Sequence, residues 1–310
     1  LIENSPDDTL KVNRLYMVGR YYDYFNSKER VTYFVSALNL AYTTKHTAGI
    51  KTISFGLVTN LFHRNMYDLA LKYCHEYMGF LESEGDTDEL QKTYNLYANL
   101  LTRQEKNDEA LIYYNKALQY NKAKGNQKQA AYVLNNISIL MLKQHKTDSA
   151  FYYGQLAIAI FQNESDQSAL ANSILGQAEI SIQQNNPEQA EKLALEALSR
   201  YETANIEQGI SNAAGVLGQI YFKQQQYEKA ISHFNIALEL IIPLKLYEQR
   251  KTLYLQLSDC YGKKGEFEKA YSFQLLYKQY NDSTIRQEQK NKMLEIEVKY
   301  YIASKENELQ

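Results

Sequence analysis

The sequence is short of the residues that interrupt helices. Its 310 residues include three prolines, 13 glycines and no tryptophan. Proline and glycine are the residues that most oppose a helix interior, so little in this chain prevents long helices. The formal net charge of -2 argues against a nucleic-acid-binding surface, because such a surface needs a net basic stripe.

Long apolar segments and paired cysteines are also lacking. No run approaches 18 apolar residues, which excludes a membrane-spanning helix within this sequence. The opening residues, LIENSPDDTL, lack the basic and apolar regions of a signal peptide, which fits a mature or a trimmed chain equally well. Cys74 and Cys260 fall in distant parts of the chain, so we predict two packing residues and no disulfide. Cysteine usage therefore leaves the compartment open.

Motifs for catalysis and for metal binding are missing as well. None of the five histidines forms an H-E-x-x-H motif or pairs with a cysteine at a metal-ligand spacing. There is no glycine-rich phosphate loop and no nucleophile elbow. The carboxylates are scattered over positions that we expect to face solvent. We therefore predict a protein that is not an enzyme and that uses no cofactor and no metal.

The chain does contain one unit that recurs every 40 residues. The segments NDEALIYYNKAL, TDSAFYYGQLAI, PEQAEKLALEAL and YEKAISHFNIAL align at their first alanine. The same spacing extends to Ala70 and Ala270, and back to Arg30, where the alanine itself is missing but Ala37 preserves the later alanine of the unit. The seven anchor positions are 30, 70, 110, 150, 190, 230 and 270. A fixed period of this length predicts a solenoid.

Each unit has the pattern of two closely packed helices. Twelve residues before the anchor stands a mostly small residue: Ala98, Ser138, Ala178, Gly218 and Ser258. Nine before it stands a larger one: Tyr21, Leu61, Leu101, Met141, Tyr221 and Tyr261. Small residues beside large ones let two helices approach and interlock. We predict an all-α solenoid of about seven helix-turn-helix units.

The units resemble the tetratricopeptide repeat (TPR). GEFEKA, QQYEKA and RNMYDLA carry its signature of an aromatic residue followed three residues later by alanine. The resemblance extends over residues 10 to 280 and implies a right-handed superhelix that serves as an interaction scaffold. The period of 40 exceeds the usual repeat of about 34, so the helices or their connections must be longer. In this the units resemble bacterial peptide-responsive regulators and kinesin light chains.

TPR geometry, by analogy, places positions 15, 11 and 7 before each anchor on a concave groove. There we predict binding of a peptide, a protein or a small ligand by Asn95, Asn99, Arg103, Asn135, Asn136, Lys143, Glu179 and Gln219. The amides suit an extended peptide backbone, and the cations could hold a carboxylate. Polar residues cover every unburied position of a solenoid, so the same residues can equally be ordinary surface.

Residues 281–310 predict one long charged helix that follows a solenoid domain at 1–280. Asp282 or Ser283 offers an N-cap, and no glycine or proline follows. By the 40-residue spacing, Leu294, Val298 and Tyr301 correspond to Tyr254, Ser258 and Tyr261. We therefore expect these three residues to cap the seventh unit as the first helix of an eighth.

The terminal segment and the opening SPDDTLKVNRLYMVGRYY are similar to the membrane-anchored TPR sensors of Bacteroidetes. That resemblance implies a periplasmic sensory module of an inner-membrane, two-component-type histidine kinase or transcriptional regulator. It also implies a downstream membrane anchor and allows a homodimer through the C-terminal helix. The alternative is a soluble cytoplasmic TPR scaffold or peptide-responsive regulator that mediates protein–protein interaction. The sequence identifies neither the ligand nor the output domain.

Overall fold

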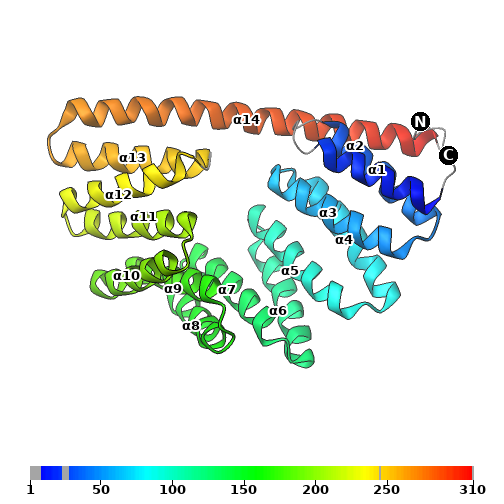
Figure 1. Ribbon diagram of the computed structural model, residues 1–310, viewed down its shortest axis with the longest axis horizontal. Helices are drawn as coiled ribbons and strands as arrows, with labels where there is room; N and C mark the ends of the chain where they lie inside the picture. The colour runs from blue at the N-terminus through cyan, green and yellow to red at the C-terminus, as the bar shows by residue number, and fades with distance from the viewer. Residues whose placement is uncertain (1–7, 23–27, 244–245, 309–310) are drawn as a thin grey trace. The chain divides into compact units, whose positions relative to one another are not determined.

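The computed structural model describes residues 8–22, 28–243 and 246–308, which form fourteen α-helices and no strand (Figure 1). The helices are α1 Thr9–Tyr21, α2 Lys28–Thr43, α3 Thr47–His63, α4 Tyr67–Glu84, α5 Thr87–Arg103, α6 Asn107–Lys124, α7 Gln127–Lys143, α8 Thr147–Asn163, α9 Gln167–Gln183, α10 Pro187–Thr203, α11 Glu207–Lys223, α12 Tyr227–Ile241, α13 Tyr247–Lys263 and α14 Phe267–Glu308. Consecutive helices pack as pairs, and the predicted all-α solenoid of seven pairs is confirmed.

Helix length explains the 40-residue period. Helix α9 has 17 residues, and three residues separate it from α10, which again has 17. Two such helices with their turns span the period seen in the sequence. The connections are short, so the lengthening relative to the usual repeat lies in the helices.

The turns between helices share one backbone geometry. A residue with positive φ follows a helix at intervals of 20 residues: Lys45, Asn65, Gly85, Glu105, Gly125, His145, Ser165, Asn185, Asn205, Gln225 and Gly265. The next residue bonds back to the helix; for example, the N–H of Lys106 donates to the carbonyl of Leu101 at 3.0 Å. This left-handed helix end satisfies carbonyls that would otherwise lack partners. Only three of these positions are glycine, so the sequence does not reveal this spacing.

Gly125→Ala should lower the free energy of unfolding by about 1 kcal/mol. The φ of Gly125 is 72°, and a Cβ there would meet no atom within 4 Å, so backbone strain is the whole cost. Urea denaturation followed by circular dichroism measures it. The control is Gly79→Ala inside α4, where a Cβ also meets no atom within 4 Å. That change should raise stability by up to about 1 kcal/mol, and equal effects of the two variants would contradict the role of the turn.

The predicted small and anchor residues meet where paired helices cross. The anchor alanines from Ala70 to Ala230 are fully buried. The Ser138 hydroxyl donates to the carbonyl of Ala150 at 2.6 Å, and the Ser258 hydroxyl to that of Ala270 at 2.8 Å. Contacts this short require the small side chains, as the sequence pattern predicts. Cys74 and Cys260 are buried free thiols, and burial raises the pKa of Cys260 to about 12.

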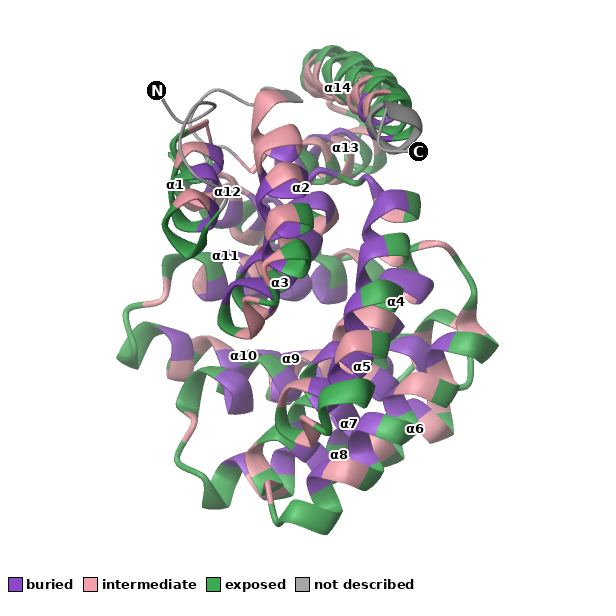
Figure 2. Ribbon diagram, turned by 90° about the vertical axis from the view of Figure 1, so that its right-hand side faces the viewer, coloured by how far each residue is buried: buried purple, intermediate pink, exposed green. Residues whose placement is uncertain are grey.

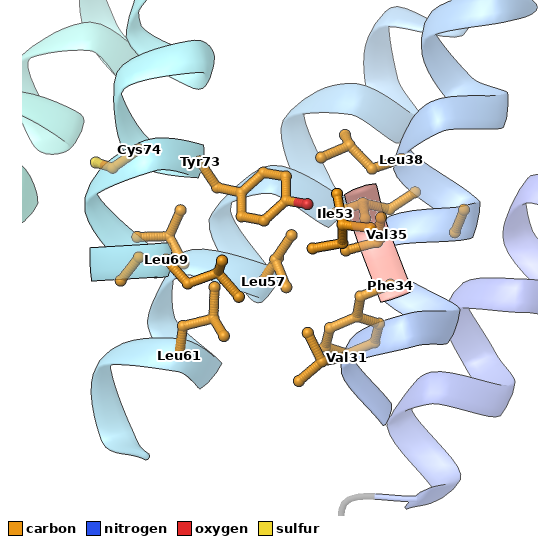
Figure 3. Packing of buried hydrophobic residues seen from close by; sticks show 14 of the residues in the cluster. Val31, Phe34, Val35, Leu38, Ile53, Leu57, Leu61, Leu69, Tyr73 and Cys74 are labelled. Atoms are coloured by element: carbon orange, nitrogen blue, oxygen red, sulfur yellow. The ribbon is translucent and has the colours of Figure 1, made fainter. Parts of the chain in front are cut away.

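The chain divides into two compact units, and the first comprises residues 1–120 and 287–310. Figure 3 shows side chains of α2, α3 and α4 filling the space between these helices, among them Phe34, Leu57 and Leu69. Val298 and Ile302 of α14 are buried in the same cluster. The end of α14 therefore shares a core with the first helix pairs.

Polar contacts reinforce this packing of α14. The Glu295 carboxylate accepts the backbone N–H of Leu69 at 3.2 Å, in the first turn of α4. No side chain of α4 itself caps that end, because its N-cap residue is Met66. The Lys299 ammonium lies 3.3 Å from both Glu295 and Asp68. A carboxylate at a helix N-terminus supplies the missing acceptor and interacts favourably with the helix dipole.

These contacts correct the prediction for the C-terminal segment. Val298 is buried in the first unit, and Leu294 and Tyr301 pack against the same cluster, so the three residues do not cap the seventh helix pair. The predicted N-cap at Asp282 or Ser283 is wrong as well, because α14 continues unbroken from Phe267 to Glu308. Asn, Asp and Ser cost only a few tenths of a kcal/mol more than typical residues inside a helix, on the order of 0.5 kcal/mol each. One continuous helix cannot fold back onto its own beginning.

The second unit comprises residues 121–286. In it the first helices of successive pairs are neighbours: α7 contacts α9, α9 contacts α11, and α11 contacts α13 (Figure 1). Figure 2 shows buried residues on the faces where helices meet and exposed residues at the turns. Across the described residues, none of the helices combines the length and the apolar character that crossing a membrane requires. The aligned faces of α7, α9, α11 and α13 form the surface on which the candidate site lies.

Candidate functional site

A groove of about 760 Å³ lies across α7, α9, α11 and α13 of the second unit. Its volume lies within the range of ligand-binding sites. The lining includes residues from all three rows that TPR geometry predicts, namely Asn135, Leu175, Gly215, Ile139, Glu179, Gln219, Lys143 and Gln183. Four predicted ligand residues are thereby brought together: Asn135, Lys143, Glu179 and Gln219.

The other four predicted ligand residues lie elsewhere. Asn136 follows Asn135 in α7 but does not line the groove, because successive helical side chains point in different directions. Asn95, Asn99 and Arg103 belong to the first unit. There the Asn99 side-chain oxygen accepts the Tyr114 hydroxyl at 2.6 Å, and the Arg103 guanidinium lies 5.8 Å from the ring centre of Phe62. A role in ligand binding stays a prediction for all eight.

One row of groove residues was missed by the sequence reasoning. It stands 18 positions before the anchors and consists of Tyr132, Asn172, Asn212 and Thr252. These residues lie three positions before the first predicted row, hence on the same helix face. The helical period could have found them, since i and i+3 share a side of a helix.

Hydroxyl groups fix the orientation of two groove asparagines. The Ser173 hydroxyl donates to the side-chain oxygen of Asn135 at 3.0 Å, and the Tyr201 hydroxyl donates to that of Asn172 at 2.6 Å. Tyr201 is buried in α10, and a Cβ on Gly209 would lie 2.2 Å from its ring, so Gly209 leaves room for the phenol. Each amide oxygen is thus occupied, and each NH₂ group is left to donate hydrogen bonds.

Glu179 supplies the carboxylate of the groove. Of the described lining residues, Glu179 is the one acid and Lys143 the one lysine. The side chain of Glu179 is exposed towards the groove, yet the surrounding walls displace water and raise its pKa above the ordinary value. The Glu179 charge also adds to the burial that raises the pKa of Tyr201 to about 12. The groove therefore combines amide donors with one poorly solvated carboxylate.

Comparisons with known proteins identify the repeats. The family model for the tetratricopeptide repeat matches residues 89–163 and 209–274. A comparison with curated proteins gives no match. Among solved structures, the apo form of RapI is similar with a TM-score of 0.73 at 12% identity, over 89% of this chain and 99% of that one.

Two further structures are similar over most of the chain. The apo form of the quorum sensor NprR from B. thuringiensis has a TM-score of 0.72 at 16% identity, over 90% of this chain and 78% of that one. The Rap conjugation gene regulator of the plasmid pLS20, in complex with the Phr* peptide, has a TM-score of 0.65 at 11% identity, over 91% and 78% of the two chains. At such identities the likeness shows the fold alone. The chain therefore carries tetratricopeptide repeats and has the fold of a tetratricopeptide solenoid.

Proposed function

We propose that the groove of the second unit binds an extended peptide and that the protein is a non-catalytic ligand-binding module. The observation that carries this proposal is the orientation of Asn135 and Asn172, whose NH₂ groups lie on neighbouring helices with their oxygens already occupied. Peptide carbonyls are the acceptors that such donors suit. Lys143, in the same lining, is placed to hold a ligand carboxylate. The structural neighbour that was solved with the Phr* peptide supports a peptide ligand.

Asn172→Asp tests the proposal, because it replaces the NH₂ donor by an oxygen that repels a peptide carbonyl. The Tyr201 hydroxyl can still donate to the new carboxylate, so the fold should persist. We expect the amount of a random pentapeptide library retained through gel filtration, measured by mass spectrometry, to fall about tenfold, equivalent to about 1.4 kcal/mol.

The matched control is Asn136→Asp in α7, outside the groove lining. This variant should retain the library as the unchanged protein does, while circular dichroism verifies that both variants are folded. Equal losses in the two variants, or no retention by the unchanged protein, would refute peptide binding in this groove.

We also propose that ligand binding serves signal transduction, as the sensory region of a membrane-anchored, periplasmic histidine kinase or transcriptional regulator. Helix α14 supports this proposal. Tyr280 in its first part accepts a hydrogen bond from the Arg250 guanidinium at 2.7 Å in the second unit, and Val298 in its last part is buried in the first. A ligand that binds two states of the groove with different affinity would act on this helix.

The full reading frame decides between this sensor and its alternative, a cytoplasmic scaffold or peptide-responsive regulator. A signal peptide upstream and an apolar segment of about 20 residues downstream would support the sensor, and the lack of both would refute it. Homodimerisation through α14 belongs to the same proposal. It is supported by the exposed stripe of Met293, Ile296 and Tyr300, and light scattering after gel filtration measures it.

A further inference from the structure

We propose that the groove recognises a positively charged group of its peptide, which contacts Glu179 above the open positions of Gly176 and Gly215. This inference rests on the proposed function and specifies its ligand: a peptide with a free amino terminus or with a lysine or arginine side chain at that site. It reverses the sequence expectation that ligand charge is held by cations of the groove alone.

The first step of the argument is the uncompensated charge of Glu179. No described residue forms an ion pair or a hydrogen bond with its carboxylate, Lys143 included. Its neighbours in the lining are apolar or neutral, such as Leu175, Ile139 and Gln219. A carboxylate in such surroundings is stabilised when a cation comes into contact with it. A cationic ligand group would supply that contact.

The second step is a pair of glycines that packing does not require. Gly176 in α9 and Gly215 in α11 lie inside helices, where glycine costs about 1 kcal/mol relative to alanine. A Cβ at either would meet no atom within 4 Å, whereas a Cβ at Gly209 or Gly218 would strike an aromatic ring. Both open glycines line the groove. The missing side chains leave room for a ligand close to the helix backbones.

The third step joins these features. Gly176 precedes Glu179 by three residues, so the two lie on the same face of α9. Gly215 occupies the matching row of the neighbouring α11. A lysine or arginine stem could lie over this floor, next to Leu175 and Val216, with its charge on the carboxylate. The two glycines and the acid thus form one subsite.

The experiment uses four pentapeptide libraries that carry a C-terminal mass tag. The central residue is arginine or its neutral isostere citrulline, and the amino terminus is free or acetylated. Retention on the full chain through gel filtration is measured by mass spectrometry. We expect at least one cationic library to be retained about tenfold more than the acetylated citrulline library. Acetylated arginine and free citrulline distinguish a side-chain cation from the amino terminus.

Three variants make the test specific. Glu179→Gln should abolish the preference for cationic libraries, while Glu239→Gln on the exposed surface of α12 should keep it. Gly176→Ala should reduce the preference several-fold without loss of thermal stability. Equal retention of all four libraries by the unchanged protein, or a preference that survives Glu179→Gln, would overturn the cation subsite while leaving peptide binding in place. Retention of none of them would overturn the proposed function itself.

Discussion

Replacing Val298 by aspartate should lower the free energy of unfolding by about 4 kcal/mol. Val298 is 1% exposed and lies in the core of the first unit together with Val31, Phe34 and Leu69. The change removes buried apolar surface and places a carboxylate among aliphatic side chains. Urea denaturation measures the loss. Hydrogen exchange should show protection falling first in α2 and α4, the helices that this end of α14 covers.

Ile296→Asp is the matched control for this variant. Ile296 lies two residues away on the same helix but is 68% exposed. The change in charge and in helix propensity is nearly the same, so only burial differs. In dilute solution, where association does not contribute, stability should change by less than about 0.5 kcal/mol. Equal losses from the two variants would contradict the packing of α14 against the first helix pairs.

The contrast between α14 and the regular pairs shows what the sequence can predict. Contacts within one pair repeat every 40 residues, such as Ser138 with Ala150 and Ser258 with Ala270, so the period reveals them. The contact of Glu295 with Leu69 joins residues 226 positions apart and occurs once. A period carries no information about such a contact. Extending the period to Leu294 and Val298 therefore gave the right apolar residues and the wrong partner.

The first helix pair shows a smaller failure of the same kind. A Cβ on Gly19 would lie 2.5 Å from the Phe34 ring, so Gly19 is the small residue of this pair, one position later than the 40-residue spacing predicts. Gly19 is accordingly buried and does not line a concave surface. Tyr21, predicted as a packing residue, is 64% exposed. Helix α1 ends at Tyr21 and α2 begins at Lys28, a wider spacing than between later helices, and this lets the register shift.

For the groove, the sequence predicts positions but not chemistry. TPR geometry placed Asn135 and Glu179 on one surface, and the structure shows both in one groove. The orientation of the Asn135 and Asn172 amides depends on hydroxyls of Ser173 and Tyr201, which only the packed structure brings within hydrogen-bonding distance. The isolation of Glu179 from any cation is likewise a property of three-dimensional arrangement.

The second large effect is expected at Gly218, where Gly218→Val should lower the free energy of unfolding by about 3 kcal/mol. A Cβ at this position would lie 2.4 Å from the ring of Phe234, which is itself 1% exposed and cannot move into solvent. The helix propensity of valine exceeds that of glycine, so overpacking alone causes the loss. Thermal and urea denaturation measure it.

Gly215→Val, three residues earlier in α11, provides the control, because a Cβ there meets no atom within 4 Å. Its stability should stay within about 0.5 kcal/mol of the unchanged protein, although the added side chain should obstruct the groove. If the ring of Phe234 is the obstacle at Gly218, Gly218→Val should cost less in a Phe234→Leu background. We expect a coupling free energy of about 1 to 2 kcal/mol between the two changes. Strictly additive losses would show that Gly218 is required for a reason other than contact with Phe234.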